Sequence, residues 1–194
     1  MAFDIYPRFF AAFLRNPKSI GAIAPSSQVL ARIITEWIDW ENADTVIEYG
    51  PGTGAFTEEI MARLRPGAKF FAIEVHPGMV ADLKRRYPNV VVYQDSVANI
   101  KEICEEQGVE EVDAIICGLP WAAFTDEEQT IFLEAMMTVL KPSAQFTTFA
   151  YLQGLLLPAG QRFKKKLTEY FSQVGRSRTV WWNLPPAFCY RCRR

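Results

Sequence analysis

The chain has 194 residues, 49% of them hydrophobic, and a formal net charge of −1. That length suits one domain with a substantial core, and no apolar run reaches the ~18 residues of a transmembrane helix. The N-terminus lacks the basic-then-apolar layout of a secretory signal, so we expect a cytoplasmic protein without a membrane span.

The charge is unevenly distributed along the chain. Residues 151–194 hold nine basic residues and one acid, and residues 1–27 hold three basic residues and one acid. The net charge of −1 therefore leaves −11 for residues 28–150. Basic ends on an acidic middle indicate a polyanionic partner, which is either a nucleic acid or an anionic membrane surface.

Residues 1–18 carry phenylalanines at helical spacing with basic residues beside them. This make-up is typical of a helix that lies in a membrane interface. Burial of one phenylalanine among acyl chains contributes about 1.5–3 kcal/mol, and a basic residue near an anionic leaflet adds about 1 kcal/mol. Packing on the protein's own sheet is the alternative. The residues expected to contact the membrane are Phe3, Phe9, Phe10, Phe13, Arg8, Arg15 and Lys18.

From residue 44 onward, apolar runs alternate with helical patterns, as in a parallel α/β sheet. Strands are predicted at residues 44–50, 68–75, 89–94, 112–118 and 144–151, and helices at 55–65, 78–87, 96–108, 125–141 and 161–174. Thr125 or Asp126 is expected to cap the helix that follows it. Two further strands, 176–183 and 187–193, should close the sheet as an antiparallel pair. This is the layout of the class I methyltransferase fold.

The four cysteines indicate neither a disulfide framework nor a metal site. They are few for a disulfide-stapled scaffold of this length. The closely spaced pair Cys189 and Cys192 lacks a second such pair to complete a zinc site, because Cys104 and Cys117 are too far apart in sequence. We therefore interpret them as ordinary residues and expect no bound metal.

The strongest functional motif is VIEYGPGTGAF, which follows a predicted strand and opens a predicted helix. Its glycines, Gly50, Gly52 and Gly54, permit a tight turn and a close backbone approach to a ligand. Glu48 suits a cationic ligand with an α-amino group, and Glu74, at the end of the next strand, can accept both ribose hydroxyls of a nucleoside. The pattern E-x-G-P-G-T-G closely resembles motif I of S-adenosylmethionine-dependent methyltransferases.

Two later strand ends carry further candidates. In this fold an acid at the end of the third strand typically binds the adenine amino group, which points to Asp95 with Ser96 beside it; helix capping is the alternative role of Asp95. The turn L-P-W after the fourth strand resembles the N-L-P-Y turn of amine methyltransferases. Gly118 stands at the Asn position and offers no side-chain acceptor for an adenine amino group. Trp121 keeps the aromatic ring, whose face attracts methylated ammonium groups, unless it only packs in the core.

The segments NPKSIGAIAPSS, EYGPGTGAFT, CGLPW and VWWNLPPAFCY together resemble bacterial soluble-type phospholipid N-methyltransferases. These enzymes methylate phosphatidylethanolamine toward phosphatidylcholine, and the likeness covers nearly the whole chain. It implies a mixed seven-stranded sheet, with residues 1–27 as membrane-contact and lid segment and residues 28–194 as catalytic domain. It also implies S-adenosylmethionine as cofactor, a phospholipid substrate and peripheral attachment to the inner face of an anionic membrane. Oligomeric state has no signal in the sequence.

The same likeness, with the motifs above, predicts roles for individual residues. The cofactor should be bound by Ser26, Glu48, Gly50, Gly52, Gly54, Glu74, Val75, Asp95 and Ser96. The Leu119 carbonyl, Trp121 and Tyr151 should orient the substrate amine, and Tyr190 and Arg178 should contact the headgroup. Lys164, Lys165 and Lys166 should form a second membrane contact. His76, the single histidine, is interpreted as a surface residue rather than a general base.

Two alternatives remain open. Basic chain ends and the L-P-W turn also suit an RNA adenine N6-methyltransferase, but Gly118 and the lack of a C-terminal RNA-binding domain make nucleic acid the less favoured partner. A membrane adaptor without enzymatic activity would need a chain that does not bind the cofactor. The complete glycine motif argues against that reading.

Overall fold

The structure is a computed structural model that describes residues 25–183 and 185–194. The strands are β1 (Thr45–Tyr49), β2 (Lys69–Ile73), β3 (Val91–Tyr93), β4 (Val112–Cys117), β5 (Leu140–Tyr151), β6 (Gln173–Arg176) and β7 (Ala187–Arg193). The α-helices are α2 (Pro25–Thr35), α3 (Ala55–Met61), α4 (Pro77–Arg86), α5 (Ile100–Glu106), α6 (Asp126–Val139) and α7 (Pro158–Tyr170). Three short 3₁₀ turns complete the described chain: η1 (Val97–Asn99), η2 (Trp121–Ala123) and η3 (Leu152–Leu156).

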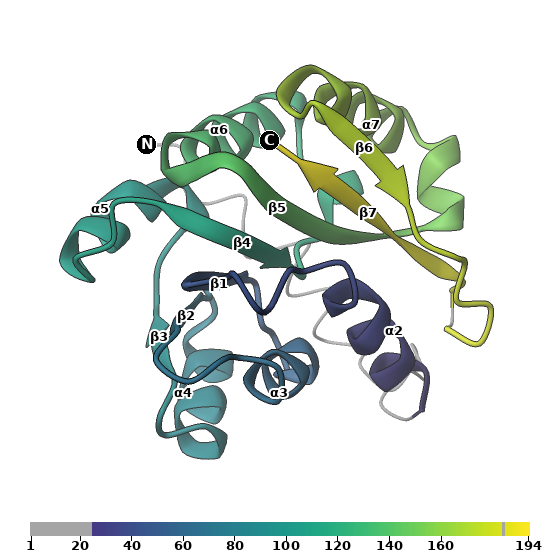
Figure 1. Cartoon of the computed structure of the whole chain (residues 1–194). Helices are drawn as coiled ribbons and strands as arrows, with labels where there is room; N and C mark the ends of the chain where they lie inside the picture. The colour runs from purple at the N-terminus through teal and green to yellow at the C-terminus, as the bar shows by residue number, and fades with distance from the viewer. Residues whose placement is uncertain (1–24, 184) are drawn as a thin grey trace.

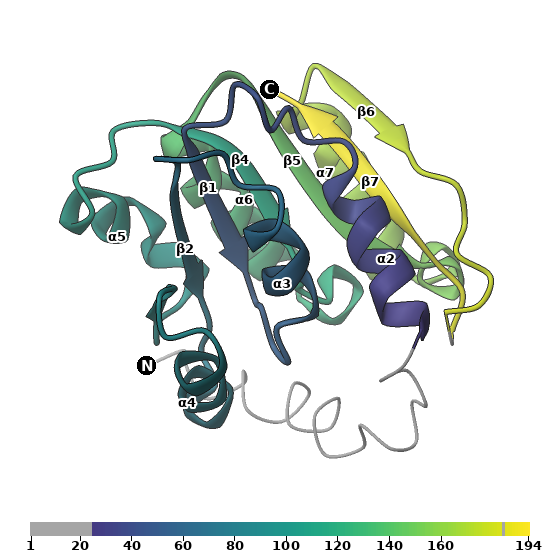
Figure 2. The ribbon, with the colours of Figure 1, turned by 60° about the horizontal axis from the view of Figure 1, so that its bottom comes forward.

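The strands form one sheet of order β3-β2-β1-β4-β5-β7-β6. Strands β1 to β5 pair in parallel, whereas β7 runs antiparallel to both of its neighbours. The sheet is the middle layer of the molecule, with α6 and α7 on one face and α2, α3 and α4 on the other (Figure 1). Figure 2 shows α2 and α3 lying across the central strands. This is the mixed seven-stranded sheet that the sequence predicts.

The central strands β1 and β4 are buried along their whole length, because helices cover both faces of the sheet. Side chains alternate between the two cores. Ile47 and Ile115 pack in the core that includes residues of α5, α6 and α7, and Val46 and Ile116 pack in the core that includes residues of α2 and α3. This close packing fixes the carboxyl ends of β1, β2 and β4 relative to one another. Among the described residues, no helix has the length and apolar character needed to cross a bilayer.

From β1 onward the chain order of strands and α-helices agrees with the sequence prediction, and so does the start of α6, whereas α2 was not predicted. Thr125 accepts from the Glu128 amide while the Glu128 carboxylate accepts from the Thr125 amide, which completes a capping box. The predicted strand at 176–183 is wrong, because the last strand pair forms earlier, at Gln173–Arg176. The Ser177 hydroxyl accepts from the Cys189 amide, so a side chain takes the place of a backbone acceptor where the ladder would continue.

Candidate active site

The glycine motif forms a tight loop between β1 and α3. Gly50, Gly52 and Gly54 all have left-handed backbone angles, with φ of 63°, 54° and 81°. Other residues rarely adopt this conformation, so the loop depends on its glycines. The Gly50 amide donates to the Ile73 carbonyl at 2.9 Å, which holds the start of the loop against the end of β2.

Glu48, within β1, is fully buried below this loop. Its Oε2 accepts from the Thr57 hydroxyl at 2.7 Å, whereas its Oε1 has no hydrogen-bond partner among the described residues. Burial raises the pKa of Glu48 to about 8; the Thr57 hydrogen bond opposes this shift, and the nearby Glu74 adds to it. A buried carboxyl group with one unpaired oxygen is suited to bind a donor group or a cation.

Glu74 follows the last residue of β2 and is 2% exposed. Its two oxygens accept from backbone amides on either side, Oε2 from Gly52 at 3.1 Å and Oε1 from His76 at 2.9 Å. Burial raises the pKa of Glu74, and these backbone hydrogen bonds oppose the shift. Val75 is 36% exposed and continues the chain away from the sheet. The His76 side chain is exposed and caps α4, as a surface residue should.

Asp95 lies near Glu74, because the Glu74 amide donates to the carbonyl of Tyr93, the last residue of β3. Ser96 caps η1 by accepting from the Ala98 amide at 3.2 Å, so capping of that turn falls to Ser96 and not to Asp95. Asp95 Oδ1 accepts from the Ser96 amide and from the Asn99 side-chain amide, at 2.6 and 2.8 Å. The ends of β2 and β3, after which Glu74 and Asp95 follow, are thus neighbours in the sheet.

The turn after β4 packs directly against the glycine loop. The Gly118 amide donates to the Tyr49 carbonyl at 2.7 Å, and a Cβ atom at Gly118 would lie 2.5 Å from the Gly50 carbonyl oxygen. A Cβ at Gly50 would in turn lie 2.6 Å from Leu119 Cδ2. The Leu119 carbonyl accepts from the Trp121 amide at 3.1 Å, which leaves its second lone pair free for another donor.

Trp121 packs in the hydrophobic core and also lines a cavity. It is 3% exposed, its ring stacks on Phe163 with 4.3 Å between centroids, and its Nε1 donates to the Thr148 hydroxyl at 3.1 Å. The Thr148 hydroxyl in turn donates to the Cys117 carbonyl in β4. The indole is therefore locked in orientation, with part of its surface forming a cavity wall.

This cavity has a volume of about 300 Å³ and is almost wholly apolar. It lies beyond the end of β4 and beside the end of β5, and it is lined by residues of β5, η2, η3, α7 and β7. Tyr151 and Tyr190 line it together with Trp121, so three predicted site residues share one cavity. Burial raises the pKa of both tyrosines, which keeps them neutral at physiological pH. The other residues that line the cavity include Phe149, Ala150, Gly154, Leu157, Gly160 and Pro185.

Several of these wall residues were missed by sequence reasoning. Gly160 is an example: a Cβ there would lie 2.0 Å from the Gly154 carbonyl oxygen, so α7 packs on η3 through two glycines. Arg178 is exposed and is not among the residues that line the cavity. Arg176 instead lies over the Tyr190 ring, 5.6 Å from its centroid, as the β6–β7 register requires. Sequence reasoning offered no signal for Arg176, because its pairing with Tyr190 depends on a β6–β7 register that the predicted strand at 176–183 does not give.

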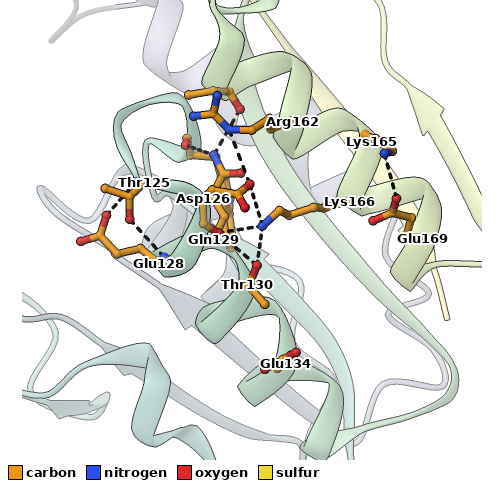
Figure 3. Close-up of polar contacts among 12 residues, drawn as sticks. Thr125, Asp126, Glu128, Gln129, Thr130, Glu134, Arg162, Lys165, Lys166 and Glu169 are labelled. Atoms are coloured by element: carbon orange, nitrogen blue, oxygen red, sulfur yellow. Dashed lines mark hydrogen bonds and ion pairs between the residues drawn. The ribbon is translucent and has the colours of Figure 1, made fainter.

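Lys165 and Lys166, neighbours in α7, have different environments (Figure 3). Lys166 has a side chain only 12% exposed; its ammonium donates to the Asp126 carbonyl at 2.7 Å, pairs with the Asp126 carboxylate at 3.0 Å and contacts the Thr130 hydroxyl. It therefore ties α7 to α6, and its prediction as a membrane contact is wrong. Lys165 is exposed, with an ion pair to Glu169 at 3.7 Å, and Lys164 is also exposed.

The remaining predictions concern residues beyond the described chain. Phe3, Phe9, Phe10, Phe13, Arg8, Arg15 and Lys18 lie outside the described residues, as does the side chain of Ser26. Where side chains are described, no group of three His, Cys, Asp or Glu residues is placed to hold a metal ion. The four cysteines are buried and free, and burial raises the pKa of their thiols.

Comparison with known proteins gives three findings. Residues 46–143 match the family model described as a methyltransferase domain. The ornithine lipid N-methyltransferase of Singulisphaera acidiphila is 31% identical over 95% of this chain and 94% of its own length. The ribosomal RNA small subunit methyltransferase A of Thermotoga neapolitana is 30% identical, over 48% of this chain and 36% of its own length.

Among solved structures, an O-methyltransferase from Bacillus cereus in complex with SAH has a TM-score of 0.68. It covers 95% of this chain and 87% of its own, at 13% identity. At that identity the likeness concerns the fold, in which the sheet and its flanking helices are shared.

Proposed function

The chain belongs to the class I S-adenosylmethionine-dependent methyltransferases, and on that premise we propose that it methylates the amine of a membrane lipid. The observation that carries this proposal is the apolar cavity of about 300 Å³ beside Trp121. A relative that methylates a lipid and matches nearly the whole chain supports it. Phosphatidylethanolamine with its mono- and dimethylated derivatives, leading to phosphatidylcholine, is the first substrate to test, and an ornithine lipid is the second.

The residues of the glycine loop fit S-adenosylmethionine. The unpaired Oε1 of Glu48 offers a buried acceptor, and Glu74 sits against the loop where a nucleoside ribose would lie. We therefore assign cofactor binding to Glu48, Glu74, Asp95 and the loop glycines, with Ser26, Val75 and Ser96 beside them. When bound, S-adenosylmethionine supplies a methyl group on a positively charged sulfur, which a neutral amine accepts.

The cavity walls favour the neutral form of the substrate amine. A primary amine has a pKa near that of lysine, about 10.4, and desolvation lowers it. Trp121 and Tyr151 provide an apolar, aromatic environment that disfavours the ammonium ion and excludes water. Because burial raises the pKa of Tyr151, its hydroxyl stays protonated and orients the amine rather than removing its proton. The free lone pair of the Leu119 carbonyl can accept the amine N–H, so the chain contributes mainly positioning.

Headgroup contact is proposed for Tyr190, which lines the cavity, with Arg178 as the more distant candidate. Peripheral attachment to the cytoplasmic face of an anionic membrane is proposed for residues 1–18, with Lys164 and Lys165 as exposed basic residues on α7. Together they would keep the enzyme at the surface where its substrate lies.

Adenine N6-methylation of RNA is the second candidate, because a ribosomal RNA methyltransferase matches about half of the chain. Gly118 argues against it. An Asn side chain at this position would begin with a Cβ atom 2.5 Å from the Gly50 carbonyl oxygen, so the loop and the turn would have to separate. With Gly118 in place, an adenine amino group lacks its usual side-chain acceptor. A lipid amine can instead use the Leu119 carbonyl.

The test is methyl transfer from labelled S-adenosylmethionine to phosphatidylethanolamine or ornithine lipid, each presented in mixed detergent micelles and in liposomes with and without anionic lipid. We expect label in the lipid fraction, and we expect deletion of residues 1–18 to lower transfer in liposomes more than in micelles. Label in RNA with none in either lipid, despite bound cofactor, would refute the lipid proposal. Transfer to only one lipid identifies the substrate.

A further inference from the structure

Four large apolar side chains are exposed near the cavity. Trp181 and Trp182, in the loop between β6 and β7, are 68% and 87% exposed. Leu156 and Leu157, where η3 meets α7, are 81% and 50% exposed. A folded chain seldom leaves tryptophans in water without a partner for them. We call these four residues the apolar rim.

The tryptophan loop is held by its own hydrogen bonds. Val180 and Ala187 exchange two backbone hydrogen bonds, of 2.7 and 3.3 Å, that close it at its base. Asn183 is 3% exposed, and its side-chain amide donates to the Pro185 carbonyl at 2.7 Å. These bonds fix the base of the loop and Asn183, and they hold Trp181 and Trp182 between them on the surface.

The rim borders the mouth of the cavity. Leu157 and Pro185 line the cavity from its two sides, and the Leu152 amide donates to the Pro186 carbonyl at 2.9 Å, which joins η3 to the tryptophan loop. Figures 1 and 2 both show η3 and this loop at the same end of the sheet, where β5 ends and β7 begins. Leu157 belongs to both the rim and the cavity wall, so the rim lies next to the cavity.

A basic groove adjoins the rim. It has a volume of about 440 Å³ and contains Lys164, Lys165 and Arg176, with no acidic residue among those that line it. Leu155 lines both the groove and the cavity, so the two are neighbours. Apolar side chains with tryptophan at the tip and basic residues beside them match the interface of an anionic bilayer, where indole rings lie among headgroups and cations lie near phosphates.

We propose that the apolar rim inserts into the interface of an anionic bilayer while Lys164, Lys165 and Arg176 bind lipid phosphates. The cavity mouth then faces the bilayer, and a lipid amine reaches Trp121 without leaving the membrane. This surface is built from residues other than 1–18. The inference rests on the proposed lipid function for its purpose, but the docking itself is tested without any methyl transfer.

The first test is binding to liposomes that contain phosphatidylglycerol and brominated lipid. We expect quenching of tryptophan fluorescence in the full-length wild type and loss of most of it in W181F/W182F. We expect W181A/W182A to bind about tenfold or more weakly, on the usual free energy of burying a large apolar side chain. Since both residues are exposed, these variants should unfold at the wild-type temperature, which circular dichroism verifies.

Charge reversal tests the groove. K164E/K165E should abolish the preference for anionic over zwitterionic liposomes, whereas K84E/R85E, which reverses two exposed basic residues of α4, should keep it. Equal liposome binding and equal quenching in wild type, W181A/W182A and K164E/K165E would overturn the docking proposal. Methyl transfer in mixed micelles separates the two proposals. If the wild type transfers no methyl group to lipid in micelles, the lipid function is refuted. If it does so, and the rim and groove variants bind liposomes as the wild type does, only the docking proposal is refuted.

Discussion

The carboxylate of Glu74 is fixed by two backbone amides, which makes it the sharpest test of the cofactor site. We expect Glu74→Ala to weaken S-adenosylmethionine binding by about 100-fold, because two charge-assisted hydrogen bonds to ribose would be lost. His76→Ala is the matched control, because the hydrogen bond from His76 to Glu74 is made by the backbone amide, which the substitution keeps. Isothermal calorimetry measures both. Unchanged cofactor affinity in Glu74→Ala would refute the assignment.

Glu48 predicts a pH dependence of stability in the cofactor-free protein. Its pKa is raised by burial from an ordinary 4.5 to about 8 in the folded chain, so between these values the folded state binds a proton that the unfolded state has released. Stability should therefore fall as pH rises through this window, by at most about 1.4 kcal/mol per pH unit, and level off above pH ~8. The free energy of unfolding is lower at high pH because the folded chain then holds a charged, buried carboxylate.

Glu48→Gln removes that titration while keeping an acceptor for Thr57. Urea unfolding at several pH values from ~5 to ~8 should give a flatter stability profile for this variant, with a gain over wild type on the order of a few kcal/mol at the alkaline end. Parallel profiles for the two proteins would contradict a raised pKa for Glu48.

Gly118 is predicted to be intolerant of any side chain. Gly118→Ala should lower the free energy of unfolding by about 1–3 kcal/mol and weaken cofactor binding, because its Cβ would push on the Gly50 carbonyl. Gly175→Ala is the control, since a Cβ there meets its nearest atom, the Arg191 carbonyl oxygen, at an ordinary 3.8 Å. Chemical denaturation compares them. Equal stability of the two variants would show that the loop and turn separate freely.

The placement of site residues was predictable where a local motif carries them. The glycine loop, Glu48 and Glu74 follow from one strand–loop–helix pattern and the acid that ends the next strand. The burial of Trp121 against Phe163, and the ion pair of Lys166 with Asp126, depend on how helices distant in sequence pack together. No periodicity within Lys164–Lys166 distinguishes the buried lysine from its exposed neighbours.

Helix packing at the cavity depends on the link between α6 and α7. Lys166→Met should lower the free energy of unfolding by about 1 kcal/mol, because it removes the ammonium that donates to the Asp126 carbonyl and the Thr130 hydroxyl and pairs with the Asp126 carboxylate, which keeps only its longer pair with Arg162 (Figure 3). Lys165→Met, which removes an exposed pair, should cost less than about 0.5 kcal/mol. Denaturant unfolding measures the difference, and equal effects would contradict a structural role for Lys166.

The order of elements was predictable because apolar runs and helical patterns alternate clearly along the chain. The position of the edge strand β6 was not predictable, because this strand is short, polar and mostly exposed. Its position depends on pairing with β7, and the apolar run at Val180–Trp182 suggested a strand where the structure has a loop with outward-facing tryptophans. Exposed apolar side chains mislead sequence reasoning because apolar residues in a strand are normally buried.

The sheet as a whole carries two sites at one edge. Glycine-loop residues lie at the ends of β1 and β2, whereas the apolar cavity lies beyond β4 and beside the end of β5, and the contact between Gly50 and Gly118 joins them. Under the proposed function, cofactor and substrate would bind from different sides and their reacting groups would meet at the L-P-W turn. The two sites should therefore be separable by mutation.

Ala150→Phe tests that separation, because Ala150 lines the cavity and a ring there would fill much of its volume. We expect unchanged affinity for S-adenosylmethionine and a loss of methyl transfer to lipid of about 100-fold, since the amine would be displaced from its position. Val91→Phe, on the exposed far edge of the sheet, is the control and should keep both. Loss of cofactor binding in Ala150→Phe would show instead that cavity and glycine loop form one continuous site.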